Sequence, residues 1–179
     1  ASAKDAVPLT ITITTIDQSP SKAKEAAEII KEQWEKAGIT VQIQTQTPGD
    51  LERDTIKPRN YQVLLFGEIL GKIPDPYPFW HSSQKFDPGL NLSSYDNKNA
   101  DQLLKDSRET MDLLLKEQKL EKLQNIIVDD APALFLYNPD YIYWVSPSVK
   151  NIETEKIIDP AKRFSNITNW FVETKRTWK

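Results

Sequence analysis

An α/β fold is predicted by three observations on this chain. Strand patterns alternate with a helical pattern in the first third, a pair of helical patterns follows, and apolar runs suited to buried strands come after that pair. The chain has 179 residues, of which 39% are hydrophobic and 27% are charged, so it can build the core of one domain, or of one domain with a tail. We therefore expect a mixed β-sheet flanked by helices.

The first part of the chain reads as strand, helix, strand and strand. Residues 9–16 (LTITITTI) alternate apolar side chains with threonine, which predicts a strand with one buried face. Residues 23–37 carry apolar side chains at helical spacing, and Gly38 follows where a left-handed turn ends a helix. Residues 39–45 alternate again, and the continuous apolar run at 61–66 predicts the central strand, buried on both faces. A right-handed parallel crossover is expected for such a unit.

The second part is predicted to be helical and then extended. Residues 99–111 and 113–128 place apolar side chains on one face, including Met111 in the first helix and Leu123 in the second. Pro132 ends the second helix, because the residue before a proline disfavours helical backbone. Three later runs read as strands: 133–137, 141–145 and 167–174.

Composition excludes several classes of function. Net charge is −3 with both signs mixed, so no basic stripe for nucleic acid exists. No run of 18 apolar residues suggests a membrane span, and the absence of cysteine excludes disulfides and thiolate metal sites. The sequence contains neither a glycine-rich phosphate loop nor a G-x-S-x-G elbow, and one histidine cannot build a metal site alone. We expect no enzyme activity, no cofactor and no metal.

The segment 67–95 is the strongest candidate for a functional site. It leaves the end of the apolar strand at 61–66 and is rich in proline, aromatic and polar residues, with little helix or strand pattern. Long irregular segments inside compact domains are uncommon and tend to be functional. Open α/β sheets also bind ligands beyond the carboxyl ends of their strands.

Each candidate residue in this segment has a functional and a structural interpretation. Trp80 could form an aromatic wall of a ligand cleft, or plug the end of the core. His81 could make a pH-sensitive contact, or be an ordinary loop histidine. Asn91 could bind a peptide backbone, or stabilise its own loop as an Asx turn does. The aromatic run 137–144 could line the cleft or pack within the sheet.

Four segments carry a resemblance to a known family: AEIIKEQWEKAGITVQIQ (27–44), YQVLLFGEI followed by IPDPYPFWHSSQ (61–84), GLNLSSYDNKNADQLL (89–104) and EKLQNIIVDDAPALFLY (121–137). In this order they resemble the C-terminal lobe of the extracellular solute-binding proteins of peptide and nickel ABC importers, over residues 9–174. The resemblance implies a periplasmic-binding-protein-like lobe with a long irregular loop on the ligand side. Residues 9–163 would form the second lobe of a longer, two-lobed protein, and 164–179 a return strand and tail that pack on the other lobe.

The resemblance also implies a function. The chain would belong to the substrate-binding component of an ABC importer, which holds a peptide or similar polar solute between two lobes by hinge closure. Its partners would be the solute, the other lobe and the transmembrane permease subunits. Its place would be the periplasm or the extracellular face of a bacterial membrane, with a lipid anchor. The alternative is a protein-interaction or sensing module, without transport, on the same fold.

In the peptide-binding branch of the family, an aspartate shortly after this strand takes the ammonium group of the ligand. This sequence departs there, because the aligned positions hold Gly71 and Lys72. Glu68 could substitute, since a carboxylate in a closed cleft pairs well with an ammonium, whereas Lys72 could favour an anionic ligand end. The alternative for both is an exposed loop charge. The predicted ligand-binding residues are Gly67, Glu68, Ile69, Lys72, Trp80, His81, Asn91 and Tyr95.

Overall fold

The structure, a computed structural model, describes residues 9–17, 22–68, 75–138, 141–152, 157 and 160–172. These residues divide into two compact units, one up to residue 133 and one from residue 134 onward. The first unit holds a parallel sheet and a helical region, and it contains the predicted ligand-binding residues that are described.

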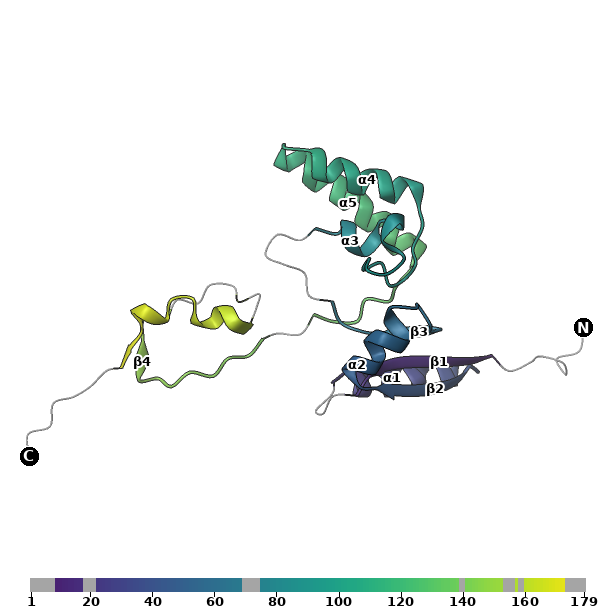
Figure 1. Cartoon of the computed structure of the whole chain (residues 1–179), viewed down its shortest axis with the longest axis horizontal. Coiled ribbons are helices and arrows are strands. Elements are labelled where there is room, and N and C mark those ends of the chain that lie inside the picture. Colours follow the sequence, from purple (N-terminus) through teal and green to yellow (C-terminus); the bar gives the residue numbers. More distant parts are fainter. Residues whose placement is uncertain are drawn as a thin grey trace, which may run out of the picture. The chain divides into compact units, whose positions relative to one another are not determined.

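The sheet of the first unit has three parallel strands in the order β2-β1-β3 (Figure 1). They are β1 (Thr10–Ile16), β2 (Thr40–Gln46) and β3 (Val63–Leu65). The parallel β1-α1-β2 unit predicted from the alternating patterns is confirmed. The prediction that 61–66 is the central strand is wrong, because β1 lies between the other two.

Burial shows why β1 takes the centre. Three successive residues, Ile13, Thr14 and Thr15, are buried, so both faces of β1 are covered rather than the one face that its alternation predicted. The Thr15 hydroxyl donates to the carbonyl of Leu65 at 2.9 Å, which allows a polar side chain to lie in the core. By contrast, Phe66 beyond β3 is 45% exposed. Because its threonines alternate with apolar residues, the sequence of β1 predicted one buried face although the strand is buried on both faces.

One helix packs on this sheet and completes its core. In α1 (Lys22–Lys36), Ala27 is buried against Ile13 and Val41. The surrounding apolar side chains are Ile30, Trp34, Ile39, Ile43, Val63 and Leu65. Gly38 follows α1 with φ +88°, which confirms the predicted left-handed helix end.

A short helical connection joins β2 to β3. Thr47 accepts a hydrogen bond from the Asp50 backbone N–H and so begins α2 (Pro48–Asp50), which leads directly into the π-helical turn η1 (Leu51–Ile56). Leu51 is buried, and the Thr55 hydroxyl donates to the side chain of Gln46 at 2.7 Å. This connection is thereby fixed to the end of β2.

The helical region consists of α3 (Tyr77–Trp80), the 3₁₀ turn η2 (Ser82–Gln84), α4 (Lys98–Glu109) and α5 (Leu113–Asp130). Asn97 begins α4 and Asp112 begins α5, each by accepting hydrogen bonds from two backbone N–H groups of the first turn. Ala131 ends α5 in a left-handed conformation directly before Pro132. The two helices predicted here are confirmed, and they pack side by side (Figure 1).

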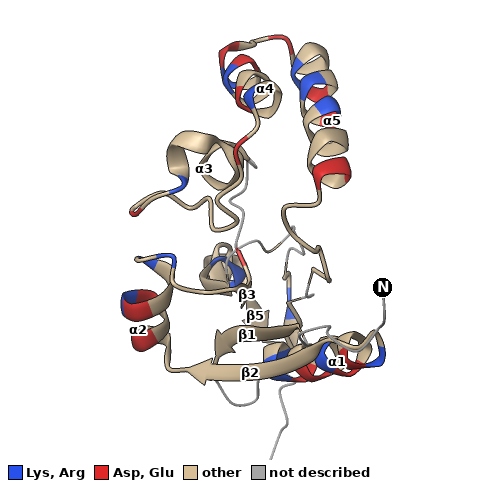
Figure 2. Cartoon of the chain, turned by 90° about the vertical axis from the view of Figure 1, so that its right-hand side faces the viewer, with Lys and Arg blue, Asp and Glu red and all other residues tan. Residues whose placement is uncertain are grey.

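A second apolar core lies within this helical region. Its buried members are Tyr95, Ala100, Leu104, Leu123 and Ile127, with Tyr77, Trp80, Leu103, Leu120 and Ile126 packed against them. Met111 does not share this face as predicted: α4 ends at Glu109, and Met111 is 96% exposed. Acidic and basic side chains are intermixed on α4 and α5, as expected for a solvated surface (Figure 2). No described helix has the length and apolar character that crossing a membrane requires.

The described residues of the second unit contain little regular structure. Its elements are β4 (Val149–Lys150), η3 (Pro160–Phe164), η4 (Ile167–Asn169) and β5 (Phe171–Val172), and β4 pairs antiparallel with β5. Phe164 joins Tyr143 and Trp170, with ring centroids 6.1 and 5.9 Å apart respectively. The predicted strand at 167–174 is thus confirmed only at β5. The division of the chain at residue 163 stays a prediction.

The predicted strands at 133–137 and 141–145 are wrong for this structure, because neither segment forms a strand. Most of their apolar side chains are exposed, and Trp144 reaches 88%. A strand needs a neighbour to pair its backbone groups. In the part of the second unit that the structure describes, the only ladder is the two-residue pair β4–β5.

Candidate functional site

The structure separates the predicted ligand-binding residues into two groups. Gly67 and Glu68 are exposed directly after β3. Ile69 and Lys72 belong to the same stretch but lie outside the described residues. The remaining four residues, Trp80, His81, Asn91 and Tyr95, come together beside the helical core.

Among the predicted ligand-binding residues, Glu68 has a carboxyl group whose pKa is strongly raised. Neighbouring chain atoms displace part of its hydration, which raises the pKa of Glu68 from the usual 4.5 to about 7 although the residue remains partly open to solvent. Its charge therefore changes near neutral pH. Such a carboxyl group gains most from a cationic partner, because pairing restores the ionised form.

Asn91 organises the loop that the sequence placed at the site. It is fully buried, and its amide group donates to the carbonyls of His81 at 3.1 Å and Tyr95 at 2.9 Å. Its side-chain oxygen accepts from the Tyr95 backbone N–H at 3.0 Å and from the Ser93 hydroxyl at 3.2 Å. These four bonds use the hydrogen-bonding capacity of the amide. Of the two interpretations of Asn91, this geometry favours the loop-stabilising one.

Tyr95 ties this loop to the end of α5. Its hydroxyl donates to Asp130 at 2.6 Å, which, after burial, is the second cause that raises the pKa of Tyr95. The same bond, with one from Asn97, lowers the pKa of Asp130. Trp80 meets the Tyr95 ring edge to face, with centroids 6.2 Å apart. Trp80 is half-buried, so it both contacts the core and presents part of its surface.

Two side chains from the sheet side hold the loop by its backbone. The Arg59 guanidinium donates to the carbonyls of Lys85 at 2.9 Å and Gly89 at 2.5 Å. The Tyr61 hydroxyl donates to the carbonyl of Leu92. Arg59 has φ +57°, so its position depends on an uncommon backbone conformation. Neither residue had a local signal in the sequence, because both partners lie about 30 residues away.

A third anchor comes from α4. Arg108 donates from Nε to both carboxylate oxygens of Asp75, at 3.2 and 3.0 Å, and this pairing lowers the pKa of Asp75. The guanidinium carbon lies 3.8 Å above the centre of the Tyr77 ring, a cation–π contact. The two residues were missed because Asp75 and Arg108 are separated by 33 positions.

Gly89 permits the tightest turn of the loop. A Cβ atom at this position would lie 2.2 Å from the carbonyl oxygen of Gln84. That oxygen already accepts the backbone N–H of Asn91 at 3.0 Å. Only glycine therefore fits the backbone path that brings Asn91 into place.

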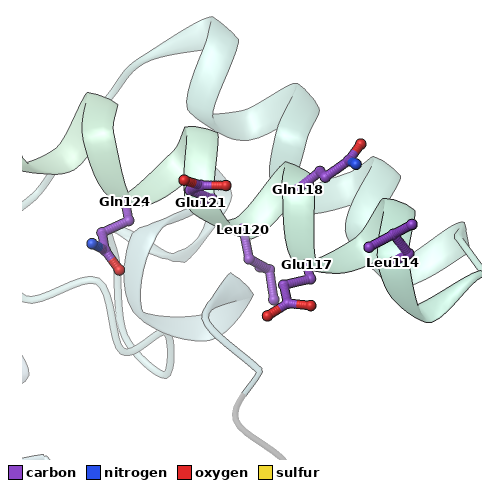
Figure 3. Close-up of a pocket in the computed structure, with 6 residues that line it drawn as sticks. All are labelled: Leu114, Glu117, Gln118, Leu120, Glu121 and Gln124. Atoms are coloured by element: carbon purple, nitrogen blue, oxygen red, sulfur yellow. The ribbon is translucent and has the colours of Figure 1, made fainter.

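A surface depression among the described residues lies elsewhere, on α5 (Figure 3). It is open and is lined by Leu114, Glu117, Gln118, Leu120, Glu121 and Gln124. It shares no residue with the predicted ligand-binding set. In the described residues, no three His, Cys, Asp or Glu side chains are grouped as metal ligands would be.

Comparisons with known proteins were made over the whole chain, and no protein-family model matches it. The chain is 30% identical over 170 residues to the oligopeptide-binding protein AppA of Bacillus subtilis (strain 168), covering 94% of this chain and 30% of AppA. It is 28% identical over 118 residues to the probable D,D-dipeptide-binding periplasmic protein DdpA of Escherichia coli (strain K12), covering 64% of this chain and 22% of DdpA.

Solved structures agree with these relatives. AppA from Bacillus subtilis in complex with a nonapeptide matches with a TM-score of 0.74 at 26% identity, over 96% of this chain and 33% of AppA. NikZ from Campylobacter jejuni in complex with Ni(L-His) matches with a TM-score of 0.68 at 20% identity, over 90% of this chain and 33% of NikZ, and shows the shared fold alone. The chain thus spans 30% of the length of AppA, and over nearly all of its own length it is similar to this oligopeptide-binding protein and shares its periplasmic-binding-protein-like fold.

Proposed function

We propose that this chain is one lobe of a solute-binding protein that encloses a peptide or a similar polar solute and delivers it to an ABC permease. The observation that supports this most is the match to AppA along nearly the whole chain, together with the structure of AppA in complex with a nonapeptide. The relatives are solute-binding proteins, which fits a protein that performs no chemistry on its ligand. No observation favours the alternative of a sensing or interaction module.

In this proposal the two groups of predicted residues have different tasks. Gly67 and Glu68 form the surface that meets the solute, whereas solute contacts of Ile69 and Lys72, which lie outside the described residues, stay a prediction. Trp80, His81, Asn91 and Tyr95 hold the loop beside that surface, and the half-exposed Trp80 also contributes an aromatic contact. The hydrogen bonds that Asn91 and Tyr95 make within the protein favour a role for both residues in stabilising the loop. A preformed loop favours affinity, because less conformational entropy is lost on binding.

Glu68 is proposed to select the charge of the solute. Its pKa of about 7 means that an ammonium group nearby would hold the carboxylate in its ionised form. Peptide affinity should therefore rise as pH increases from 6 to 8, provided that the amino group of the peptide remains charged. A solute without a cation would show the opposite preference, since an unpaired carboxylate is costly in a closed cleft.

The wider setting is proposed on the same basis. The solute would be held between this lobe and a second one, and ligand binding would favour the closed arrangement of the two. The closed protein would then dock on the transmembrane permease subunits. The name of DdpA describes a periplasmic protein, and we propose the periplasm or the outer membrane face, with a lipid anchor, for the present one.

A thermal-shift screen of the full-length protein against pooled short peptides, sugars and metal chelates tests the proposal. A shift with peptides, reduced in Glu68→Gln, is the expected result. Glu117→Gln is a matched control, because Glu117 is an exposed carboxylate on α5. Shifts with sugars or chelates alone would contradict the peptide assignment, and no shift with any pool would contradict solute binding.

The 179-residue chain should bind far more weakly than the full-length protein. If the whole protein binds with micromolar affinity, the total free energy is about −8 kcal/mol, and half of that corresponds to a millimolar complex. Calorimetry with the same peptide on both proteins measures the ratio. Equal affinities would mean that closure between two lobes contributes nothing.

A further inference from the structure

His81 is the only histidine of the sequence and is almost completely buried, with 4% of its surface exposed. Its ring stacks on Tyr77 with centroids 4.2 Å apart and an interplanar angle of 21°. Its Nδ1 atom accepts a hydrogen bond from the backbone N–H of Ser83 at 3.0 Å, which makes it the cap of the 3₁₀ turn η2. The imidazole thus fills the N-cap role that Ser, Asp or Asn usually has at the start of a helix.

This bond determines the tautomer of the neutral ring. A backbone N–H can only donate, so Nδ1 must offer its lone pair and the proton of the neutral imidazole lies on Nε2. Nε2 is buried, and among the described residues it has no hydrogen-bond partner. A single proton added to Nδ1 would place two donors against each other and break the cap.

The charges around the ring give the added proton one alternative partner. An Asp101 carboxylate oxygen lies 3.9 Å from Nδ1, but Asp101 already accepts from the Ser82 backbone N–H at 2.9 Å and from its hydroxyl at 2.5 Å. Burial lowers the pKa of His81; Asp101 opposes this, while Lys105 and Arg108 of α4 add to it. Arg108 is itself paired with Asp75.

We propose that His81 is a proton-sensitive lock on the loop that runs from Tyr77 to Tyr95. Neutral His81 caps η2, while protonated His81 loses the Ser83 bond and competes for Asp101, which releases Ser82. The carbonyl of His81 is also a partner of the buried Asn91 amide, so loosening of this turn reaches the bonds that organise the loop. The inference goes beyond the proposed function and does not depend on the identity of the solute.

The sign of the pH effect follows from linkage. The folded-state pKa lies below the unfolded value of 6.5, so the unfolded chain binds the proton more readily. The stabilising effect of neutral His81 is present above pH 6.5 and is lost as pH falls through the folded-state pKa. Between these two values the folding equilibrium constant should fall by up to about tenfold per pH unit.

Nuclear magnetic resonance on the wild-type chain tests the lock directly. Because the sequence has one histidine, its ring signals belong to His81 without assignment variants. We expect the Nε2–H tautomer, a pKa below 6.5, and a fall in the protection factor of the Ser83 amide (intrinsic over observed exchange rate) on acidification. The Asn99 amide, which is capped by the non-titrating Asn97, is the internal control. Its exchange rate should change with pH only as the intrinsic rate does. The Nδ1–H tautomer, or a pKa at or above 6.5, would overturn the proposal.

His81→Asn provides the matched variant. Asparagine can accept the Ser83 N–H, as Asn97 accepts that of Asn99, but it cannot be protonated. Its unfolding equilibrium should lose the fall below pH 6.5 that the wild type shows, whatever its absolute stability. An unchanged pH dependence in His81→Asn would also overturn the proposal. If this variant fails to fold, the wild-type tautomer and pKa still decide the matter.

Discussion

Residues 75–130 and the second region, residues 134–138 and 141–145, are both rich in apolar and aromatic side chains, but only the first region buries them. In the first region Tyr95 and Leu104 are buried, and Asn91 satisfies four polar groups within its own loop. In the second, the side chains of Leu134 and Trp144 face solvent, and the backbone forms neither helix nor strand. An apolar segment therefore forms a core only where neighbouring segments bury its side chains and also provide hydrogen-bond partners for its backbone and polar groups.

The first prediction breaks the first region at its tightest turn. Gly89→Ala would bring a Cβ within 2.2 Å of the Gln84 carbonyl oxygen, so the backbone must move. We expect a loss of about 3 kcal/mol in the free energy of unfolding, measured by urea denaturation. Gly49→Ala is the control, because nothing lies within 4 Å of its Cβ and it lies in α2. Equal effects of the two substitutions would refute this account of the turn.

The second prediction removes the polar centre of the same region. Asn91→Ala leaves the Tyr95 carbonyl without its donor and the Tyr95 backbone N–H without its acceptor, whereas the His81 carbonyl keeps the Gln84 backbone N–H. Each unsatisfied group costs about 1–3 kcal/mol, so we expect a loss of about 2–3 kcal/mol after partial relaxation. Asn99→Ala, at an exposed asparagine of α4, should change stability by less than about 0.5 kcal/mol. A wild-type stability for Asn91→Ala, together with weaker solute binding, would restore its ligand role.

The third prediction compares one tryptophan from each region. Trp80→Ala removes a ring that packs against the helical core and Tyr95, and should cost about 2 kcal/mol, below the full range for a buried aromatic because Trp80 is only half-buried. Trp144→Ala should cost less than about 0.5 kcal/mol, since that side chain is 88% exposed. Both values come from urea unfolding of the 179-residue chain. A larger cost for Trp144→Ala would show that the second region is packed.

The fourth and smallest prediction concerns Glu68, at the start of the loop. Its raised pKa means that the folded chain favours the protonated form, so its contribution to stability falls as pH rises from 4.5 to about 7. Glu68→Gln should therefore gain stability relative to wild type across this window, and its unfolding measured at several pH values checks the direction. A gain that is already complete at pH 4.5 would contradict the raised pKa.

The sequence predicted the elements whose signals are local. Gly38 ended α1, Pro132 ended α5, and alternation located β1 and β2. It failed where burial depends on distant partners: Thr14 and Thr15 concealed the central strand. The short strand β3 was predicted to be central from its continuous apolar run, but the residues of a strand do not reveal which strands pair with it.

The same reasoning applies to the candidate site. Proline and aromatic composition located the loop at 67–95, and the Asx interpretation of Asn91 described its bonds. Arg59, Tyr61 and Arg108 were missed, because each contacts a segment about 30 residues away and none lies in a motif. The cap at His81 was missed for a different reason, since histidine is not a usual capping residue.

Hydrogen exchange of the 179-residue chain, followed by mass spectrometry, tests the contrast between the two regions most directly. Amides of α4, α5 and the loop around Asn91 should exchange slowly, close to the rate set by global unfolding, whereas amides of 134–138 and 141–145 should exchange as fast as an unstructured peptide. Comparable protection in both regions would contradict the account, because the second region would then have a packed structure of its own.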